Sequence, residues 1–128
     1  MDRQAVLEWV QRQYGTLPDD PWARYPHYAV LRSPRGKWYG VMMDVPRDKL
    51  GLAGTGNAEV LNVKCAPLLV GSLWLQAGFL PAYHMNKSSW VSILLNGTVS
   101  NEEIKNLIDM SYTLVQAKRR RKSRDCED

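Results

Sequence analysis

The sequence predicts an α+β domain in which helices from the start, middle and end of the chain pack against a β-sheet. Residues 2–14 and 101–118 carry apolar side chains at helical spacing along one side, which indicates two helices with a buried face. Residues 27–45, 59–65 and 91–95 are rich in branched and aromatic side chains, as strands are. A proline-led apolar segment between the last two regions predicts a third helix.

The first helix has a signal at each end. Asp2 can serve as N-cap, because its carboxylate can accept from backbone N–H groups two or three residues later. Gly15 suits the left-handed position that ends a helix. The segment 16–26 contains prolines and paired acids, and it predicts a loop.

Residues 27–45 are predicted to form a β-hairpin. Its strands cover residues 28–32 and 37–45, and the turn at 33–36 contains a proline and a glycine. Alternation places Trp38, Gly40 and Met42 on one face, and Tyr39, Val41 and Met43 on the other. Because both faces are apolar, we expect this strand to be central or covered on both sides.

The glycine-rich segment 46–58 is interpreted as a mobile connector. Its glycines resemble a phosphate-binding loop, but the Gly-Lys-Ser/Thr ending is absent and a strand follows in place of a helix. In that strand, residues 59–65, alternation places Asn62 and Lys64 on the side opposite Leu61 and Val63.

The middle helix is predicted over residues 67–76 and is apolar on nearly all sides. Such a helix is expected to be buried on more than one side, by a second layer of structure or by a partner chain. Burial of a leucine-sized side chain is worth about 1.5–3 kcal/mol. Self-association through the helix from Leu68 to Leu75 is therefore a candidate partnership.

The C-terminal third begins with a helix stop at Gly78 and ends in the last helix. Between them, Pro81 excludes regular helix, and a polar segment at residues 84–90 precedes an apolar strand. The last helix starts at a capping box formed by Ser100 and Glu103.

Length and charge indicate one domain with a charged tail. The 128 residues are predicted to form a domain over 1–117, followed by a basic and then acidic tail at 118–128, frayed or disordered. The net charge is +4, but residues 1–117 hold eleven Lys/Arg and ten Asp/Glu, so most of the surplus lies in the tail. A basic surface on the domain would therefore need local clustering.

A cytoplasmic, non-membrane protein is expected. No apolar stretch approaches the roughly 18 residues that span a bilayer, and the first residues do not have the pattern of a secretory signal. The two cysteines, Cys65 and Cys126, are far apart in the sequence, and a disulfide is not expected.

The sequence predicts neither an enzyme nor a metal or cofactor site. His27 and His84 are the only histidines, and no cysteine or carboxylate pair accompanies them at ligand spacing. No nucleophile elbow is present either. The paired acids at 19–20 and 102–103 fall in a turn and a helix start, where they have structural roles.

Four residues of the polar segment have two interpretations. Functionally, Lys87 could contact a phosphate, Asn86 a base edge or phosphate, and Trp90 could stack on a base. Structurally, Asn86 could hold a turn, His84 could bind a neighbouring carbonyl, and Trp90 could fill the core.

The motifs together resemble the MmcQ/YjbR family. The family pattern combines a lysine-containing strand that leads into a Pro-led helix, a His-x-Asn-Lys-x-x-Trp segment, a glycine turn, and a last helix with Ser-Tyr or Ser-Phe. The matching stretches here are Asn62-Val63-Lys64-Cys65-Ala66-Pro67, Leu80-Pro81-Ala82-Tyr83-His84-Met85-Asn86-Lys87-Ser88-Ser89-Trp90, and Leu95-Asn96-Gly97-Thr98-Val99-Ser100 to Asp109-Met110-Ser111-Tyr112, with the Gly36-Lys37-Trp38-Tyr39 hairpin. The resemblance covers residues 1–117. Many relatives have a second histidine where this chain has Ser89, which argues against a mechanism that needs two imidazoles there.

This resemblance implies a CyaY-like fold, an antiparallel sheet with helices packed against it. It also implies a DNA-binding protein with a double-wing arrangement. Because the sequence shows no catalytic pair, we expect this protein to be non-enzymatic and to contact phosphates through Lys and Arg. The candidate nucleic-acid contacts are Arg35, Lys37, Lys64, His84, Asn86, Lys87, Arg119, Arg120 and Arg121. The alternative is an interaction module that binds a protein or a small ligand and no nucleic acid, favoured by the near-neutral domain and the apolar middle helix.

Overall fold

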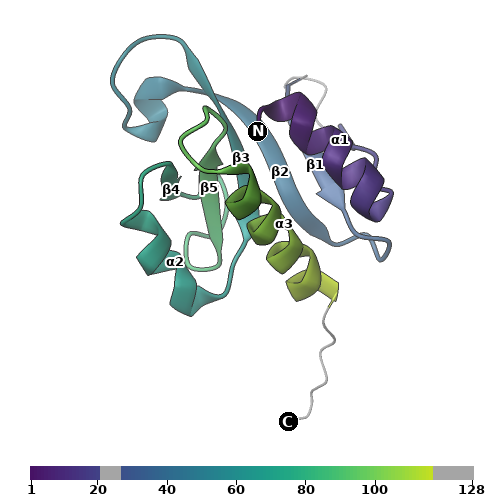
Figure 1. Ribbon diagram of the computed structural model, residues 1–128. Coiled ribbons are helices and arrows are strands. Elements are labelled where there is room, and N and C mark those ends of the chain that lie inside the picture. Colours follow the sequence, from purple (N-terminus) through teal and green to yellow (C-terminus); the bar gives the residue numbers. More distant parts are fainter. Residues whose placement is uncertain (21–26, 117–128) are drawn as a thin grey trace.

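The computed structural model describes residues 1–20 and 27–116, which form an α+β fold. Figure 1 shows helices crossing one face of a single sheet. In chain order the elements are α1 (Arg3–Tyr14), β1 (Ala29–Arg32), β2 (Trp38–Pro46), the short 3-10 helix η1 (Arg47–Leu50), β3 (Asn57–Lys64), α2 (Pro67–Trp74), β4 (Phe79–Pro81), β5 (Trp90–Leu94) and α3 (Asn101–Gln116).

The sheet has five strands in the order β1-β2-β3-β5-β4, and every neighbouring pair is antiparallel. This arrangement confirms the antiparallel sheet with three helices that the sequence and its family resemblance predicted. Among the described residues, no helix is both long and apolar enough to cross a bilayer.

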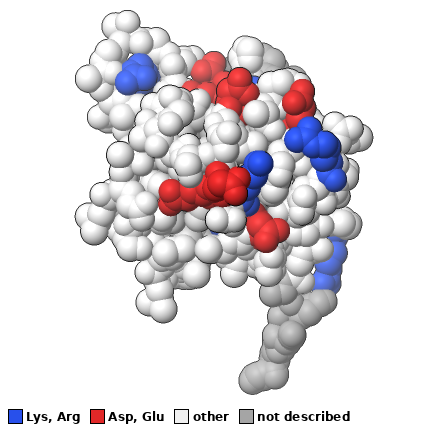
Figure 2. All heavy atoms as spheres, viewed as in Figure 1, with Lys and Arg blue, Asp and Glu red and all other residues white. Residues whose placement is uncertain are grey.

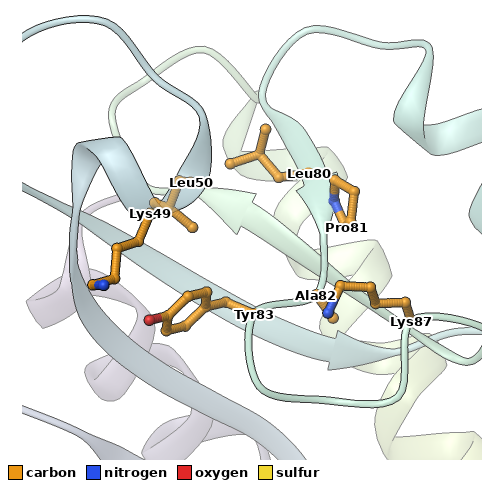
Figure 3. A pocket seen from close by; sticks show the side chains of 7 residues that line it. All are labelled: Lys49, Leu50, Leu80, Pro81, Ala82, Tyr83 and Lys87. Carbon is orange, nitrogen blue, oxygen red and sulfur yellow. The ribbon is translucent and has the colours of Figure 1, made fainter.

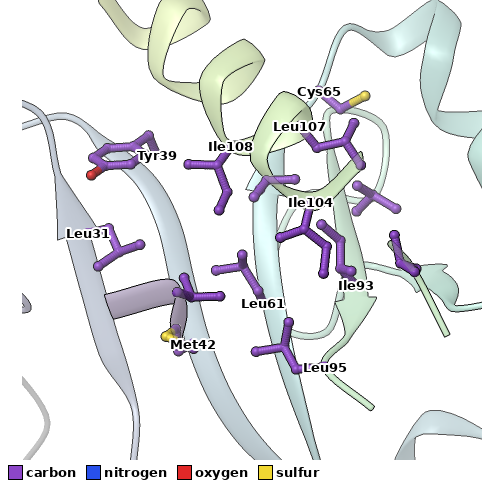
Figure 4. Close-up of a cluster of buried hydrophobic side chains, with 14 of the residues drawn as sticks. Leu31, Tyr39, Met42, Leu61, Cys65, Ile93, Leu95, Ile104, Leu107 and Ile108 are labelled. Atoms are coloured by element: carbon purple, nitrogen blue, oxygen red, sulfur yellow. The ribbon is translucent and has the colours of Figure 1, made fainter. Parts of the chain in front are cut away.

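The three α-helices contribute to one buried cluster on the same face of the sheet. Ile104 and Ile108 of α3 lie over Leu61 of β3 and Ile93 of β5 (Figure 4). Val6 and Val10 of α1, and Val70 and Leu73 of α2, complete this helix-side core.

The second face of the sheet carries its own buried cluster, and loops cover it in place of α-helices. Its centre is formed by Val30, Val41, Met43, Val45, Val60 and Leu94. Leu50 and Leu52 pack on it from the η1 region, and Tyr83 and Met85 pack on it from the loop at residues 82–89. Strand β2 is therefore apolar on both faces because both are covered, as the sequence predicted.

The helix boundaries follow the caps that the sequence predicted. The Asp2 carboxylate accepts from the Ala5 N–H at 2.9 Å, and Gly15 takes the left-handed conformation with φ of 72°. The Ser100 hydroxyl likewise accepts from the Glu103 N–H at 3.1 Å and starts α3.

The expected faces of Trp38 and Tyr39 were wrong, because β2 contains an irregularity. Leu31 pairs with Gly40, whereas Arg32 pairs with Trp38, so Tyr39 is an extra residue opposite the junction. Tyr39 therefore joins the helix-side core and Trp38 packs on the second face. A Cβ on Gly40 would lie 2.8 Å from a Leu31 methyl carbon, so the Leu31 side chain would have to move to admit a side chain at this position.

Helix α2 also differs from expectation, since within the described residues it is buried on one side only. Val70 and Leu73 are buried, whereas Leu68 is 99% exposed and Leu75 just beyond the helix is 89% exposed. The described chain supplies no second layer over these two leucines.

Two elements were missed in the sequence. The connector at 46–58 contains η1, and the main-chain N–H of Arg47 donates to Gly56 O at 2.9 Å across its loop. Strand β4 is a three-residue strand at the sheet edge, where Pro81 is tolerated. The predicted tail, with Arg119, Arg120 and Arg121, lies outside the described residues.

Candidate nucleic-acid interface

Four of the candidate cations lie at one end of the sheet. Lys64 ends β3, and it pairs with Trp90 at the start of β5. The β1–β2 turn with Arg35 and Lys37 adjoins the start of β2, beside the end of β3. The loop with Lys87 precedes β5 at the same end. The strand order therefore puts Lys64 between the two loops.

These four cations are available for an external partner. Arg35, Lys37 and Lys87 are exposed and Lys64 is half-buried. Within the described residues none of the four makes an ion pair, whereas Arg3 pairs with Glu59 and Arg32 pairs with Asp19, each at 2.9 Å.

Several acids lie at the opposite end of the sheet. Asp44 near the end of β2 pairs in register with Glu59 near the start of β3, and Asp48 follows in η1. Residues 1–20 and 27–116 hold ten Lys/Arg and ten Asp/Glu, so their net charge is zero with neutral histidines. On the helix face, Figure 2 shows acidic and basic side chains interspersed. The helix face therefore carries no single basic patch.

Two buried polar side chains fix the loop that carries Lys87. The Ser92 hydroxyl donates to the Asn62 side-chain oxygen, and both residues are fully buried. The Tyr83 N–H donates to Ser92 Oγ at 3.1 Å, and Asn62 Nδ2 donates to the Tyr83 carbonyl at 3.3 Å. Both main-chain groups of Tyr83 are thus held against the second face of the sheet.

The sequence interpretation placed Asn62 on the correct face but missed this role, and it missed Ser92. The available signal was a polar side chain inside each of two apolar strands. A buried polar side chain needs hydrogen-bond partners, and here each side chain is one partner of the other.

His84 has an unusual backbone conformation immediately after the held residue. Its φ is 60°, the only positive value among non-glycine residues in the described part of the chain. Its exposed ring lies edge-on to Tyr83, with 4.1 Å between ring centroids. A non-glycine residue in this region carries backbone strain that the surrounding contacts must hold.

Asn86 and Trp90 have structural roles. Asn86 Oδ1 accepts from the Ser88 N–H at 3.0 Å and from the Ser88 hydroxyl at 2.7 Å, so it closes the turn. The Cys65 N–H donates to the Ser89 carbonyl at 2.8 Å and ties the loop to the residue after β3. Trp90 is buried and fills space, so it offers no free ring for stacking.

Comparison with known proteins places this geometry in a family. The YjbR family model matches residues 11–114. The chain belongs to the YjbR family. The uncharacterized protein YyaQ of Bacillus subtilis (strain 168) is 44% identical over 117 residues, which cover 91% of this chain and 99% of YyaQ. The resemblance inferred from the sequence is thereby confirmed.

Solved structures share the fold. A Pseudomonas syringae protein in a crystal structure is 45% identical, with a TM-score of 0.87, and the match covers 89% of this chain and 98% of that one. A solution structure from the same organism gives 41% identity, a TM-score of 0.83, and coverage of 96% and 99%. A Deinococcus radiodurans crystal structure, at 24% identity, a TM-score of 0.71 and coverage of 92% and 81%, shows the fold alone.

The Ser-Tyr pair of the YjbR-like last helix holds the cationic end of β3. The Ser111 hydroxyl accepts from the Lys64 N–H at 2.8 Å and donates to the Tyr39 carbonyl at 2.7 Å. Tyr112 stacks on Tyr14 with ring centroids 4.0 Å apart, and both rings meet Tyr39 edge-on. These contacts connect α1, β2, β3 and α3. They give the Ser-Tyr pair a structural role that needs no ligand.

Burial perturbs three titratable groups near this framework. Burial raises the pKa of Tyr39 to about 12, against a smaller opposing effect of its hydrogen bond with Thr16. Burial raises the pKa of Tyr14 well above its ordinary value, and the Asp109 carboxylate, which accepts a hydrogen bond from the Tyr14 hydroxyl, adds to the effect. Burial likewise raises the pKa of the Cys65 thiol.

No cluster of three or more histidine, cysteine or acidic side chains that could hold a metal ion occurs within the described ranges. His84 is exposed on the loop, and His27 is exposed just ahead of β1. The features of the candidate site that the described residues show are its cations and the hydrogen-bonded turns that carry them.

Proposed function

We propose that this YjbR-family protein is a non-enzymatic, cytoplasmic DNA-binding protein that contacts phosphates through Lys and Arg. The observation that carries the proposal is the convergence of Arg35, Lys37, Lys64 and Lys87 at one end of the sheet. Four cations that make no ion pair within the described residues, on three separate segments, suit a polyanion, which presents phosphates at regular intervals.

In this proposal the two wings are the β1–β2 turn and the loop at residues 82–89, with Lys64 between them. Neighbouring strands are about 4.8 Å apart, so the sheet end extends across roughly 20 Å, more than the roughly 12 Å width of the DNA major groove. Phosphate contacts carry no sequence information directly. We therefore expect weak sequence preference, with Arg119, Arg120 and Arg121 as further cations.

Fluorescence anisotropy with a labelled duplex tests this proposal. Each phosphate contact contributes a slope of about −0.9 to the dependence of log affinity on log salt. Four contacts therefore predict a loss of affinity of roughly a hundredfold between 50 and 200 mM salt. Absence of binding at the lower salt concentration would exclude the function.

Matched charge variants locate the surface. Arg35→Gln with Lys37→Gln should weaken duplex binding and reduce the salt slope by about 2. The control, Arg12→Gln with Lys105→Gln, removes the same charge from helices α1 and α3. Equal loss in both pairs would mean that net charge, and not this end of the sheet, drives binding.

The alternative, an interaction module for a protein or a small ligand, is favoured by one observation. Leu68 in helix α2 and Leu75 just after it present apolar side chains to solvent. These two leucines could contact a second copy of the chain or another protein. The oligomeric state of the protein in solution tests the first of these possibilities.

A further inference from the structure

A pocket of about 290 Å³ lies on the second face of the sheet, between η1 and the loop at residues 82–89. Its walls come from both segments and from β4: Lys49, Leu50, Leu80, Pro81, Ala82, Tyr83 and Lys87. The volume lies just below the roughly 300–1,000 Å³ found for ligand pockets, so a small ligand is indicated.

The two sides of the pocket are held by separate sets of contacts. On the loop side, the Asn62–Ser92 pair fixes Tyr83 through both of its main-chain groups. On the η1 side, Leu50 packs on the second-face core, and Arg47 Nε donates to the Ala53 carbonyl at 2.6 Å. The walls are therefore set before any ligand arrives, which lowers the entropic cost of binding.

The pocket combines an apolar wall with two positive charges. In Figure 3 the Leu50, Leu80 and Pro81 side chains line the wall beyond the Tyr83 ring, and the ammonium groups of Lys49 and Lys87 flank that ring. Neither lysine makes an ion pair within the described residues, and no acidic side chain lines the pocket. A ligand that neutralises both lysines must supply about two negative charges.

We propose that this pocket binds a small organic phosphate monoester. Both lysines attract the dianionic phosphate, Lys49 from one side of Tyr83 and Lys87 from the other, and an aromatic or aliphatic body packs against the apolar wall of Leu50 and Leu80. A phosphate monoester supplies about −1.5 to −2 charges at pH 7, whereas a carboxylate supplies one. The inference goes beyond DNA binding, because Lys49 and the apolar wall lie outside the four cations at the sheet end.

Phenyl phosphate is the probe, followed by ¹H–¹⁵N NMR on the full chain. We expect saturable shifts at the amides of Leu50, Ala82 and Tyr83, with a Kd of about 1 mM for a ligand of this size. Inorganic phosphate and benzyl alcohol should each bind at least tenfold more weakly, because one lacks the apolar body and the other lacks the charge. Equal binding by either control ligand, or shifts centred elsewhere, would overturn the proposal.

Variants separate the pocket from the DNA surface. Lys49→Gln with Lys87→Gln should weaken phenyl phosphate binding about tenfold, since each exposed ion pair is worth up to about a fivefold change. Lys105→Gln on α3 is the charge control and should change the Kd less than twofold.

The single variant Lys49→Gln makes failure of the two proposals distinguishable. It should weaken phenyl phosphate binding while the affinity for duplex DNA at fixed salt remains within twofold. Unchanged phenyl phosphate binding in both lysine variants would overturn the pocket proposal and leave the DNA proposal standing.

Discussion

The backbone segments that carry the candidate cations are held in place by hydrogen bonds from a few buried or turn-forming polar residues. Asn62 and Ser92 are fully buried between apolar neighbours, and their hydrogen bonds end on the main chain of Tyr83. Asn86 and Ser111 act in the same way, on the turn and on the end of β3. The conspicuous polar residues of the family pattern are thus mostly explained as supports for backbone.

Replacing Asn62 tests the buried support. Asn62→Leu leaves the Tyr83 carbonyl and the Ser92 hydroxyl without this partner inside the protein. Each buried polar group without a partner costs about 1–3 kcal/mol, so the free energy of unfolding should fall by about 2–4 kcal/mol. Urea unfolding at pH 7 measures it, and a loss below 0.5 kcal/mol would contradict the role assigned to Asn62.

Asn86 and Lys87 are neighbours with opposite expected behaviour. Asn86→Ala removes the acceptor for two Ser88 groups and should lower the free energy of unfolding by about 0.5–1.5 kcal/mol. Asn86→Asp keeps an acceptor and should lose less. Lys87→Ala should remain within about 0.5 kcal/mol, as exposed surface substitutions do, yet weaken DNA binding. A large stability loss in Lys87→Ala would show that this lysine is structural.

At the scale of elements, the sequence predicts the helices and strands whose positions depend on hydrophobic periodicity and on capping residues. Both long helices begin at their predicted caps because Asp2 and Ser100 satisfy exposed N–H groups locally. The faces of Trp38 and Tyr39 could not be predicted, since a single extra residue in β2 reverses the alternation and depends on the partner strand. β4 has three residues, too few for a pattern to show.

The tyrosines that join α1, β2 and α3 should make stability sensitive to alkaline pH. Tyr14 and Tyr39 have a raised pKa in the folded protein, whereas the unfolded chain releases each proton near pH 10. Above pH 10 the folded state therefore binds more protons, so the free energy of unfolding decreases as pH rises toward 12. For buried Tyr39 the slope is on the order of 1 kcal/mol per pH unit, and for Tyr14, which is partly exposed, solvent screening makes it smaller.

Tyr14→Phe isolates one of these contributions. The variant has no phenol proton at this position, so its stability should fall less steeply between pH 10 and 12 than that of the unchanged protein. Urea unfolding at pH 8, 10 and 11.5 measures the difference. Parallel pH profiles would mean that Tyr14 titrates alike in the folded and unfolded chains.

At the scale of the whole molecule, the cluster of cations depends on strand order. Arg35, Lys64 and Lys87 are far apart in the sequence, and composition indicates only that the domain is nearly neutral. The order β1-β2-β3-β5-β4 brings their segments to one end. The pocket is less predictable still, because η1 reaches Tyr83 only through packing on the second face. The sequence alone could identify the individual candidate residues, but only the strand order of the sheet shows that they lie together.

The exposed side of α2 leads to the last prediction, which concerns self-association. Leu68 and Leu75 are exposed and seven residues apart, so they share one side, and helix α2 contains no charged residue. Burying each leucine is worth about 1.5–3 kcal/mol, but this short helix falls well below the roughly 800 Å² per partner of a stable interface. We therefore expect a weak dimer that forms only at high concentration.

Sedimentation velocity should show this dimer, and the double substitution Leu68→Glu with Leu75→Glu should abolish it. Because both side chains already face solvent, the free energy of unfolding of this variant's monomer should differ from that of the original protein by no more than about 0.5 kcal/mol. A monomer at every concentration would remove self-association and leave the two leucines to a different protein partner.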